Sequence, residues 1–188
     1  MKRTVTFGEI MLRLKTPEHM RILQTDAFEA SYGGAEANVA VSLAVLKDPV
    51  SFVTKLPENP VGTAALNEVR RYGADTSKVV IGGSRLGIYF FEKGTDIRPT
   101  NVVYDREGSA LALAKPEEFH WDEILKDTDI FYFSGVTPAV SENIAKAVLE
   151  ALKYCKAHGI ETVCDLNYRS KIWNTKKSQS VMSGLMNY

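Results

Sequence analysis

Cysteine and histidine are scarce in this chain of 188 residues. The two cysteines, Cys155 and Cys164, lack Cys-x-x-Cys spacing, and the three histidines, His19, His120 and His158, are scattered along the chain. Zinc sites and histidine-based catalytic triads need such residues in close combination. We therefore expect no metal site and no such triad, and we interpret both cysteines as small buried side chains.

Neither an excess of one charge nor a long apolar run is present. Lys and Arg total 23 and Asp and Glu total 23, which gives no basic surface for nucleic acid or anionic lipid. The first residues lack the apolar core of a signal peptide, and no segment approaches the roughly 20 apolar residues of a membrane span. We expect a cytoplasmic protein that binds neither nucleic acid nor membranes and meets an anionic ligand with individual arginines.

Three familiar motifs of nucleotide and ester chemistry are also missing. The sequence has no Gly-x-x-x-x-Gly-Lys-Ser/Thr loop, no strand-linked Gly-x-Gly-x-x-Gly and no Gly-x-Ser-x-Gly. These absences argue against a P-loop NTPase, a standard dinucleotide-binding fold and an α/β-hydrolase.

What remains is an ordinary globular composition with 45% hydrophobic residues. Strand-like and helix-like hydrophobic patterns alternate along the chain, which predicts an α/β fold. The last part of the sequence has the pattern of a strand, a helix and a strand, which is the order of a parallel crossover. We predict core strands at 4–7, 50–55, 79–81, 129–133 and 160–166, and helices at 35–47, 61–72, 141–157 and 175–186.

Residues 85–115 depart from this pattern. Two aromatic segments, 86–92 and 101–106, alternate partly in polarity and are separated by polar turn residues. This arrangement favours a β-hairpin over a βαβ unit.

One face of the predicted hairpin carries groups suited to a ligand. Period-two geometry places Val102, Tyr104 and Arg106 on one face and aligns Tyr89 with Phe91. An arginine beside two tyrosines suits a sugar that carries a carboxylate. Two interpretations stay open: a surface ribbon in which the tyrosines only pack, and a lid over a cleft.

A two-glycine turn precedes the first predicted helix. Gly33 and Gly34 lack Cβ atoms, so the backbone can take positive φ and approach a ligand closely. The helix start that follows presents unpaired N–H groups, and the Asn38 amide can both donate and accept. We interpret this turn as a place to hold a small polyol, with a plain turn as the alternative.

Further polar groups follow the predicted parallel strands. Glu9 follows the first strand, Ser134 and Gly135 follow the strand at 129–133, and Arg169 follows the last. Ligands of open parallel sheets bind at the carboxyl ends of the strands. For Arg169 an ion pair with Asp165 is an equally open interpretation.

On these features the chain resembles the PfkB or ribokinase-like carbohydrate kinases, and among them the 2-keto-3-deoxygluconate kinases. The run Gly-Gly-Ala-Glu-Ala-Asn-Val-Ala from Gly33 is similar to the first family signature, although Lys47 stands where a glycine or serine is expected. Pro57-Glu-Asn-Pro-Val-Gly is similar to the segment that closes this signature. The resemblance implies a three-layer α/β/α sandwich, incomplete on its C-terminal side, with a small β-sheet lid from about 11–32 and 85–115.

The resemblance implies eight substrate-binding residues. The glycine turn and the asparagine contact sugar hydroxyls, and the two tyrosines line the lid side. The two arginines face the carboxylate or the reacting end, and the glutamate accepts a hydroxyl. These residues are Gly33, Gly34, Asn38, Tyr89, Tyr104, Arg106, Arg169 and Glu9.

The implied reaction is phosphorylation of 2-keto-3-deoxy-D-gluconate to its 6-phosphate, with ATP and Mg²⁺. The family's catalytic aspartate lies in a Gly-Ala-Gly-Asp motif, which this sequence lacks, together with an Asn-x-x-Glu element. The resemblance places these and the adenine-binding segments beyond Tyr188. We assign no catalytic residue and expect 1–188 to be a sugar-binding portion with little kinase activity of its own.

Two other functions stay open. The chain is interpreted either as a non-catalytic module that binds a sugar acid or dimerises, or as part of a kinase of the same fold for fructose, a nucleoside or another sugar. As partners we expect a small sugar acid and a second copy of the chain. An exposed aromatic strand invites pairing between lids, which predicts a homodimer.

Overall fold

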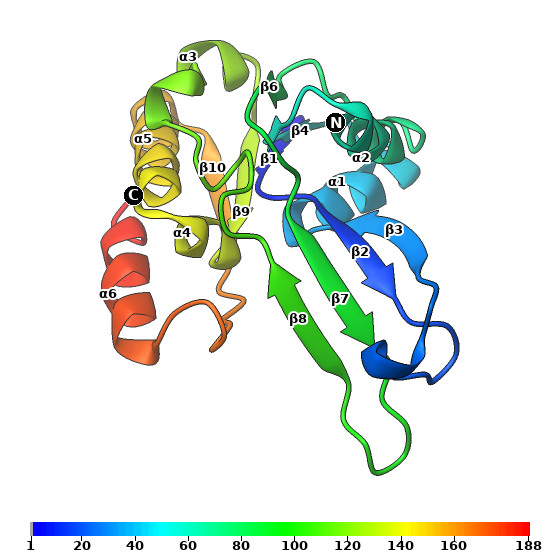
Figure 1. Cartoon of the computed structure of the whole chain (residues 1–188). Helices are drawn as coiled ribbons and strands as arrows, with labels where there is room; N and C mark the ends of the chain where they lie inside the picture. The colour runs from blue at the N-terminus through cyan, green and yellow to red at the C-terminus, as the bar shows by residue number, and fades with distance from the viewer. Residues whose placement is uncertain (1) are drawn as a thin grey trace.

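A parallel sheet of four strands forms the centre of the computed structural model, which describes residues 2–188 (Figure 1). The strand order is β10-β9-β1-β4, and each neighbouring pair is parallel. Val5 and Phe7 of β1 are buried, as expected for a central strand covered on both faces. The strands are β1 (Thr4–Phe7), β4 (Val50–Val53), β9 (Ile130–Ser134) and β10 (Glu161–Asp165).

Helices cover both faces of this sheet. On one face α5 (Glu142–His158) packs with α3 (Trp121–Ile124) and α6 (Thr175–Leu185) over a cluster that includes Phe7 and Phe131. On the other face α1 (Ala35–Val45) and α2 (Pro60–Arg70) enclose a second cluster around Phe52. Burial of each such phenylalanine contributes about 1.5–3 kcal/mol. The layers are helix, sheet and helix, as predicted.

Polar caps fix where the predicted helices begin. The side chains of Asn59, Ser141 and Asn174 each accept hydrogen bonds from the first backbone N–H groups of α2, α5 and α6. At the other ends, Gly73 (φ 94°) follows α2 and Gly159 (φ 69°) follows α5 in the left-handed region. The predicted helices at 61–72, 141–157 and 175–186 are confirmed to within two residues.

The predicted parallel crossover is also confirmed. Strand β10 pairs in parallel with β9, and α5 connects them. A short helix, α4 (Val136–Val140), lies between β9 and α5 and was not predicted.

One predicted core strand is wrong. Residues 80 and 81 form β6 (Val80–Ile81), which pairs with β5 (Lys55–Leu56) in a separate two-stranded sheet. The reason lies at β4, the sheet edge, where the Phe52 N–H donates to the carbonyl of Asp75. That segment occupies the edge, so the residues after it pair with β5 and do not join the central sheet. Val80 still packs against the core, whereas Ile81 is 52% exposed.

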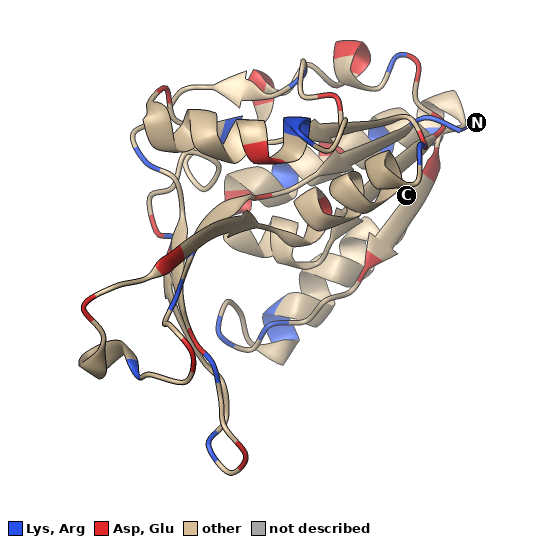
Figure 2. Cartoon of the chain, turned by 90° about the vertical axis from the view of Figure 1, so that its right-hand side faces the viewer, with Lys and Arg blue, Asp and Glu red and all other residues tan. Residues whose placement is uncertain are grey.

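A second sheet extends from the α/β body as a lid (Figure 2). Its order is β3-β2-β7-β8, with β2 and β7 parallel and the two outer pairs antiparallel. The predicted hairpin is therefore confirmed as β7 and β8. After β8 the chain returns to the body, where Leu111 and Ala114 are buried in the core under α5. The lid strands are β2 (Met11–Lys15), β3 (Glu29–Gly33), β7 (Ile88–Glu92) and β8 (Asn101–Asp105).

Single 3-10 turns complete the description, η1 (Ile22–Gln24) in the lid and η2 (Pro116–Glu118) in the body. Figure 2 shows lysines, arginines and acidic residues interspersed over both parts. Within residues 2–188, no helix combines the length and the apolar character that a membrane span requires.

Candidate functional site

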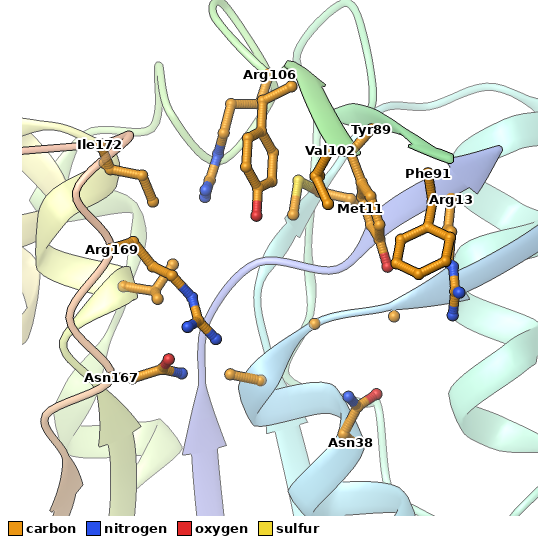
Figure 3. A pocket seen from close by; sticks show the side chains of 15 residues that line it. Met11, Arg13, Asn38, Tyr89, Phe91, Val102, Arg106, Asn167, Arg169 and Ile172 are labelled. Atoms are coloured by element: carbon orange, nitrogen blue, oxygen red, sulfur yellow. The ribbon is translucent and has the colours of Figure 1, made fainter. Parts of the chain in front are cut away.

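A cavity of about 290 Å³ lies between the lid and the carboxyl edge of the central sheet (Figure 3). Seven of the eight residues predicted for the site line it, contributed by the glycine turn, the lid hairpin and the segment after β10. They are Gly33, Gly34, Asn38, Tyr89, Tyr104, Arg106 and Arg169. Segments far apart in the sequence therefore meet at one place.

Eight further lining residues were not among the predicted site residues. Phe91 and Val102 were predicted to share a face with the tyrosines, and they form a cross-strand pair. Asn167 lies in the run that carries Arg169. Ala35 lies in the signature run that begins at Gly33. No motif marks the remaining four, Met11, Arg13, Val136 and Ile172.

The lid wall is a row of polar side chains across three strands. Arg13 of β2 lies opposite Tyr89 of β7, which lies opposite Tyr104 of β8. The two tyrosine rings lie 5.9 Å apart between centroids. Burial raises the pKa of the Tyr89 phenol above its ordinary value, an effect that the positive charge of Arg13 opposes. At neutral pH Tyr89 therefore stays protonated and can donate a hydrogen bond.

The glycine turn forms the opposite wall, but not through positive φ as predicted. Gly34 is extended (φ −171°, ψ 154°), and no side chain caps helix α1 that follows it. Glycine is needed there for space, because a Cβ on Gly34 would lie 1.9 Å from the carbonyl oxygen of Glu9. A Cβ on Gly33 would meet only ordinary contacts, 3.6 Å from Asn38 Oδ1 and 3.8 Å from Tyr89 Oη. The turn therefore lets the helix start approach the end of β1.

Glu9 is the one predicted residue that does not line the cavity. It is only 5% exposed, and its two carboxylate oxygens are engaged by different partners. Ser109 Oγ donates to Oε1 at 2.5 Å, and an Nη of Arg106 donates to Oε2. Gly87 leaves room for this pair, since a Cβ there would lie 2.9 Å from Glu9 Oε1. Glu9 thus anchors Arg106 from below the cavity.

Arg169 enters the cavity from the body side, beside Asn167. It forms no ion pair with Asp165 in the described chain; Asp165 Oδ1 instead accepts from the Asn167 N–H at 3.0 Å. Asn167 has a φ of 36°, which this Asx-type turn accommodates. The turn holds the side chains of Asn167 and Arg169 in the cavity, as Figure 3 shows.

A buried carboxylate ties the glycine turn to the strand on its far side. Glu36 of α1 is 1% exposed, and its Oε1 accepts from the Ser134 N–H and the Thr137 hydroxyl, both at 2.8 Å. Burial raises the pKa of Glu36, and these hydrogen bonds oppose the shift. A Cβ on Gly8 would lie 2.1 Å from Glu36 Oε2. Glu36 therefore fixes α1 relative to β9 and α4.

The electrostatics of the cavity favour an anion. Its lining holds three guanidinium groups, from Arg13, Arg106 and Arg169, and no Asp or Glu within the described chain. Only the charge of Arg106 is offset, by Glu9 beneath it. Across residues 2–188 no group of three or more His, Cys, Asp or Glu side chains comes together to hold a metal ion.

Comparison with solved structures identifies the class of fold. A crystal structure of 2-dehydro-3-deoxygluconokinase from Thermotoga maritima matches the whole chain with a TM-score of 0.97 and 48% identity, over 58% of its own length. An uncharacterized sugar kinase from Pyrococcus horikoshii, solved with ATP, matches with a TM-score of 0.82 at 23% identity, over 97% of this chain and 58% of its own, which speaks for the fold alone. The fold is ribokinase-like, as predicted.

The family follows from the sequence comparison. The model of the pfkB family carbohydrate kinases matches residues 1–188. The curated 2-dehydro-3-deoxygalactonokinase of Haloferax volcanii is 39% identical over 181 residues, which are 96% of this chain and 57% of that protein. This chain belongs to the pfkB family of carbohydrate kinases, and it spans somewhat more than half the length of these relatives.

Proposed function

We propose that this chain is the sugar-binding part of a kinase that phosphorylates 2-keto-3-deoxygluconate or a closely related sugar acid. The observation that carries the proposal is the charge of the cavity: three guanidinium groups line it and no carboxylate does. A neutral sugar needs no such cations, whereas a carboxylate gains charge-assisted hydrogen bonds from them.

The walls divide the task of holding the substrate. Gly34 and Asn38 meet sugar hydroxyls at the start of α1, while Tyr89 and Tyr104 close the lid side. Arg106, held by Glu9, faces the sugar acid from the lid. In this proposal Glu9 acts through Arg106 and not by accepting a hydroxyl itself.

Arg169 lies at the carboxyl edge of the sheet, where the reacting end of the substrate would be placed. Positioning and charge compensation are the main tasks in phosphoryl transfer, because charge spreads over the transferred oxygens. A guanidinium at this edge suits that end of the substrate. The 188 residues contain no Gly-Ala-Gly-Asp motif for a catalytic base.

The residues that contact the sugar hydroxyls would decide which sugar acid binds. The two relatives above bear different names, a gluconate type and a galactonate type, which differ in the orientation of a hydroxyl. The walls that meet the hydroxyls, Gly34 and Asn38, are the place where such a difference would be sensed.

ATP and Mg²⁺ belong to this proposal through the family. Mg²⁺ prefers carboxylate and other oxygen ligands, and the cavity lining offers arginines, amides and phenols without a carboxylate. The lining of this cavity therefore does not fit Mg²⁺. ATP is the co-substrate, and we assign no residue of this chain to its adenine.

Two assays test the proposal on the 188-residue chain. Calorimetric titration should show binding of 2-keto-3-deoxygluconate that Arg106→Ala weakens by about 1.5–3 kcal/mol, since one charge-assisted bond is lost. Fructose affinity should be the same for both proteins. Tighter binding of fructose than of the acid by the parent would overturn the proposal in favour of a neutral-sugar kinase.

The second assay is ATP-dependent phosphorylation of the same acid. We expect little or no turnover from this chain alone. A turnover number in the ordinary range of about 1–100 per second would contradict that expectation. Binding without turnover is also what a non-catalytic sugar-acid module would give, and only a longer reading frame that encodes Gly-Ala-Gly-Asp would favour the kinase.

A further inference from the structure

Arg13 of strand β2 is the cation of the cavity that no sequence motif marks. Its guanidinium carbon lies 4.1 Å from the centre of the Phe91 ring, a cation–π contact that fixes the group against the lid. Figure 3 shows it beside Phe91 and Tyr89, on the opposite side of the cavity from Arg169 and Asn167.

The charge of Arg13 has no partner inside the described chain. It forms no salt bridge there, and its Nε is buried without a hydrogen-bond partner. The acidic residue of the neighbouring strand, Glu29, is paired with Lys15 at 2.7 Å. Although Nε itself is closed off from solvent, the side chain of Arg13 lines the cavity. Its positive charge, which has no ion-pair partner in the described chain, is therefore available to an anionic ligand there.

Arg106 differs from Arg13 in this respect. The carboxylate of Glu9 already compensates Arg106, and the two form a pair whose net charge is zero. Arg13 therefore supplies the uncompensated positive charge at the lid end of the cavity, in the same cross-strand row as Tyr89 and Tyr104.

We propose that Arg13 is a specificity-determining residue that selects a sugar carrying a carboxylate over its neutral counterpart. This inference rests on the proposed function and adds to it the orientation of the ligand in the cavity. The acid end lies under the row Arg13, Tyr89 and Tyr104, and the end that reacts lies toward Arg169.

The test compares two ligands that differ only at one end. 2-Keto-3-deoxygluconate carries a carboxylate where 3-deoxyfructose carries a hydroxymethyl group. In calorimetric titrations Arg13→Gln should lower the affinity for the acid by roughly 10- to 100-fold. Its affinity for 3-deoxyfructose should stay within about twofold of the parent's. Arg21→Gln removes an exposed lid arginine outside the cavity and is the matched control, with both affinities unchanged.

The outcomes separate the two proposals. If the parent binds the acid no more tightly than 3-deoxyfructose, the proposed function fails and this inference fails with it. If Arg106→Ala weakens binding of the acid and Arg13→Gln does not, only the role of Arg13 is overturned. Equal weakening of both ligands by Arg13→Gln would show a packing role and would also overturn it.

A measurement on the unaltered chain tests the inference even if the Arg13→Gln variant does not fold. The Nε–H resonance of Arg13 should shift in NMR spectra when the acid is added and stay in place with 3-deoxyfructose. No shift at saturating acid would overturn the inference.

Discussion

Glu9 and Arg106 form a partly buried ion pair that links residues 97 positions apart, one at the end of β1 and one at the end of the lid hairpin. Their side chains are 5% and 13% exposed. The pair therefore joins the body to the lid at the base of the cavity, and it sets the position of a guanidinium that lines the site.

Breaking this pair should cost stability. Glu9→Gln keeps an acceptor for Ser109 but leaves Arg106 without its charged partner, so we expect a loss of about 3 kcal/mol in the free energy of unfolding. Urea unfolding at neutral pH measures it. The matched control is Glu161→Gln, which breaks the exposed pair with Lys2 and should change stability far less than Glu9→Gln does, because solvent screens exposed charges. Equal losses in the two variants would contradict the structural role of the Glu9 pair.

The two glycines of the turn should respond differently to alanine. Gly34→Ala places a methyl group 1.9 Å from the Glu9 carbonyl oxygen. Because the backbone must shift to relieve this overlap, the free energy of unfolding should fall by about 1–3 kcal/mol. Gly33→Ala meets only van der Waals contacts, so its stability should stay within about 0.5 kcal/mol of the parent. Its methyl group would occupy the cavity, and acid affinity should fall. Thermal unfolding and calorimetry check both, and a Gly34→Ala variant as stable as the parent would refute the close approach.

The buried Glu36 should give stability a pH dependence of known sign. Its folded pKa lies above the ordinary value of 4.5, so between these two values the folded state binds more protons than the unfolded state. Stability from this group is complete below pH 4.5 and is lost as pH rises through the folded pKa.

Glu36→Gln keeps an acceptor for Ser134 and Thr137 without a charge. We therefore expect the variant to gain stability relative to the parent as pH rises above 4.5, measured by urea unfolding at each pH. All other carboxylates are common to both proteins and cancel in the difference. A difference that does not change with pH would contradict a buried, titrating Glu36.

The proposed homodimer should depend on the outer face of the lid. Val103 of edge strand β8 is 46% exposed and points away from the cavity-facing Val102 and Tyr104. If lids pair, Val103→Lys should convert the dimer to a monomer in sedimentation velocity experiments, because an edge lysine opposes strand pairing. Ile81→Lys, at a 52% exposed position of the body, is the control and should leave the dimer intact. A parent chain that sediments as a monomer would refute this prediction.

Much of the fold was predictable because its signals are local. The helix caps Asn59, Ser141 and Asn174 lie directly before the helices they begin, and the crossover from β9 to β10 is continuous in sequence. The misplaced strand at residues 79–81 failed because its pairing was decided elsewhere, by Asp75 at the edge of β4.

The site divides in the same way. Gly34, Tyr104 and Arg106 lie in segments with a pattern of their own, and their place in the cavity followed from that pattern. Arg13 became a cavity residue only because β2 pairs in parallel with β7, 76 positions further on at Tyr89. Glu9 was predicted to touch substrate, and only its contacts with Ser109 and Arg106 reveal an anchoring role.

A crystal structure of the 188-residue chain soaked with 2-keto-3-deoxygluconate is the most direct measurement. We predict one sugar acid between Gly34 and the lid, with its carboxylate within hydrogen-bonding distance of a lid arginine and its far end toward Arg169. The contradictory result is an empty cavity, or a sugar acid bound elsewhere with all three guanidinium groups of the cavity free.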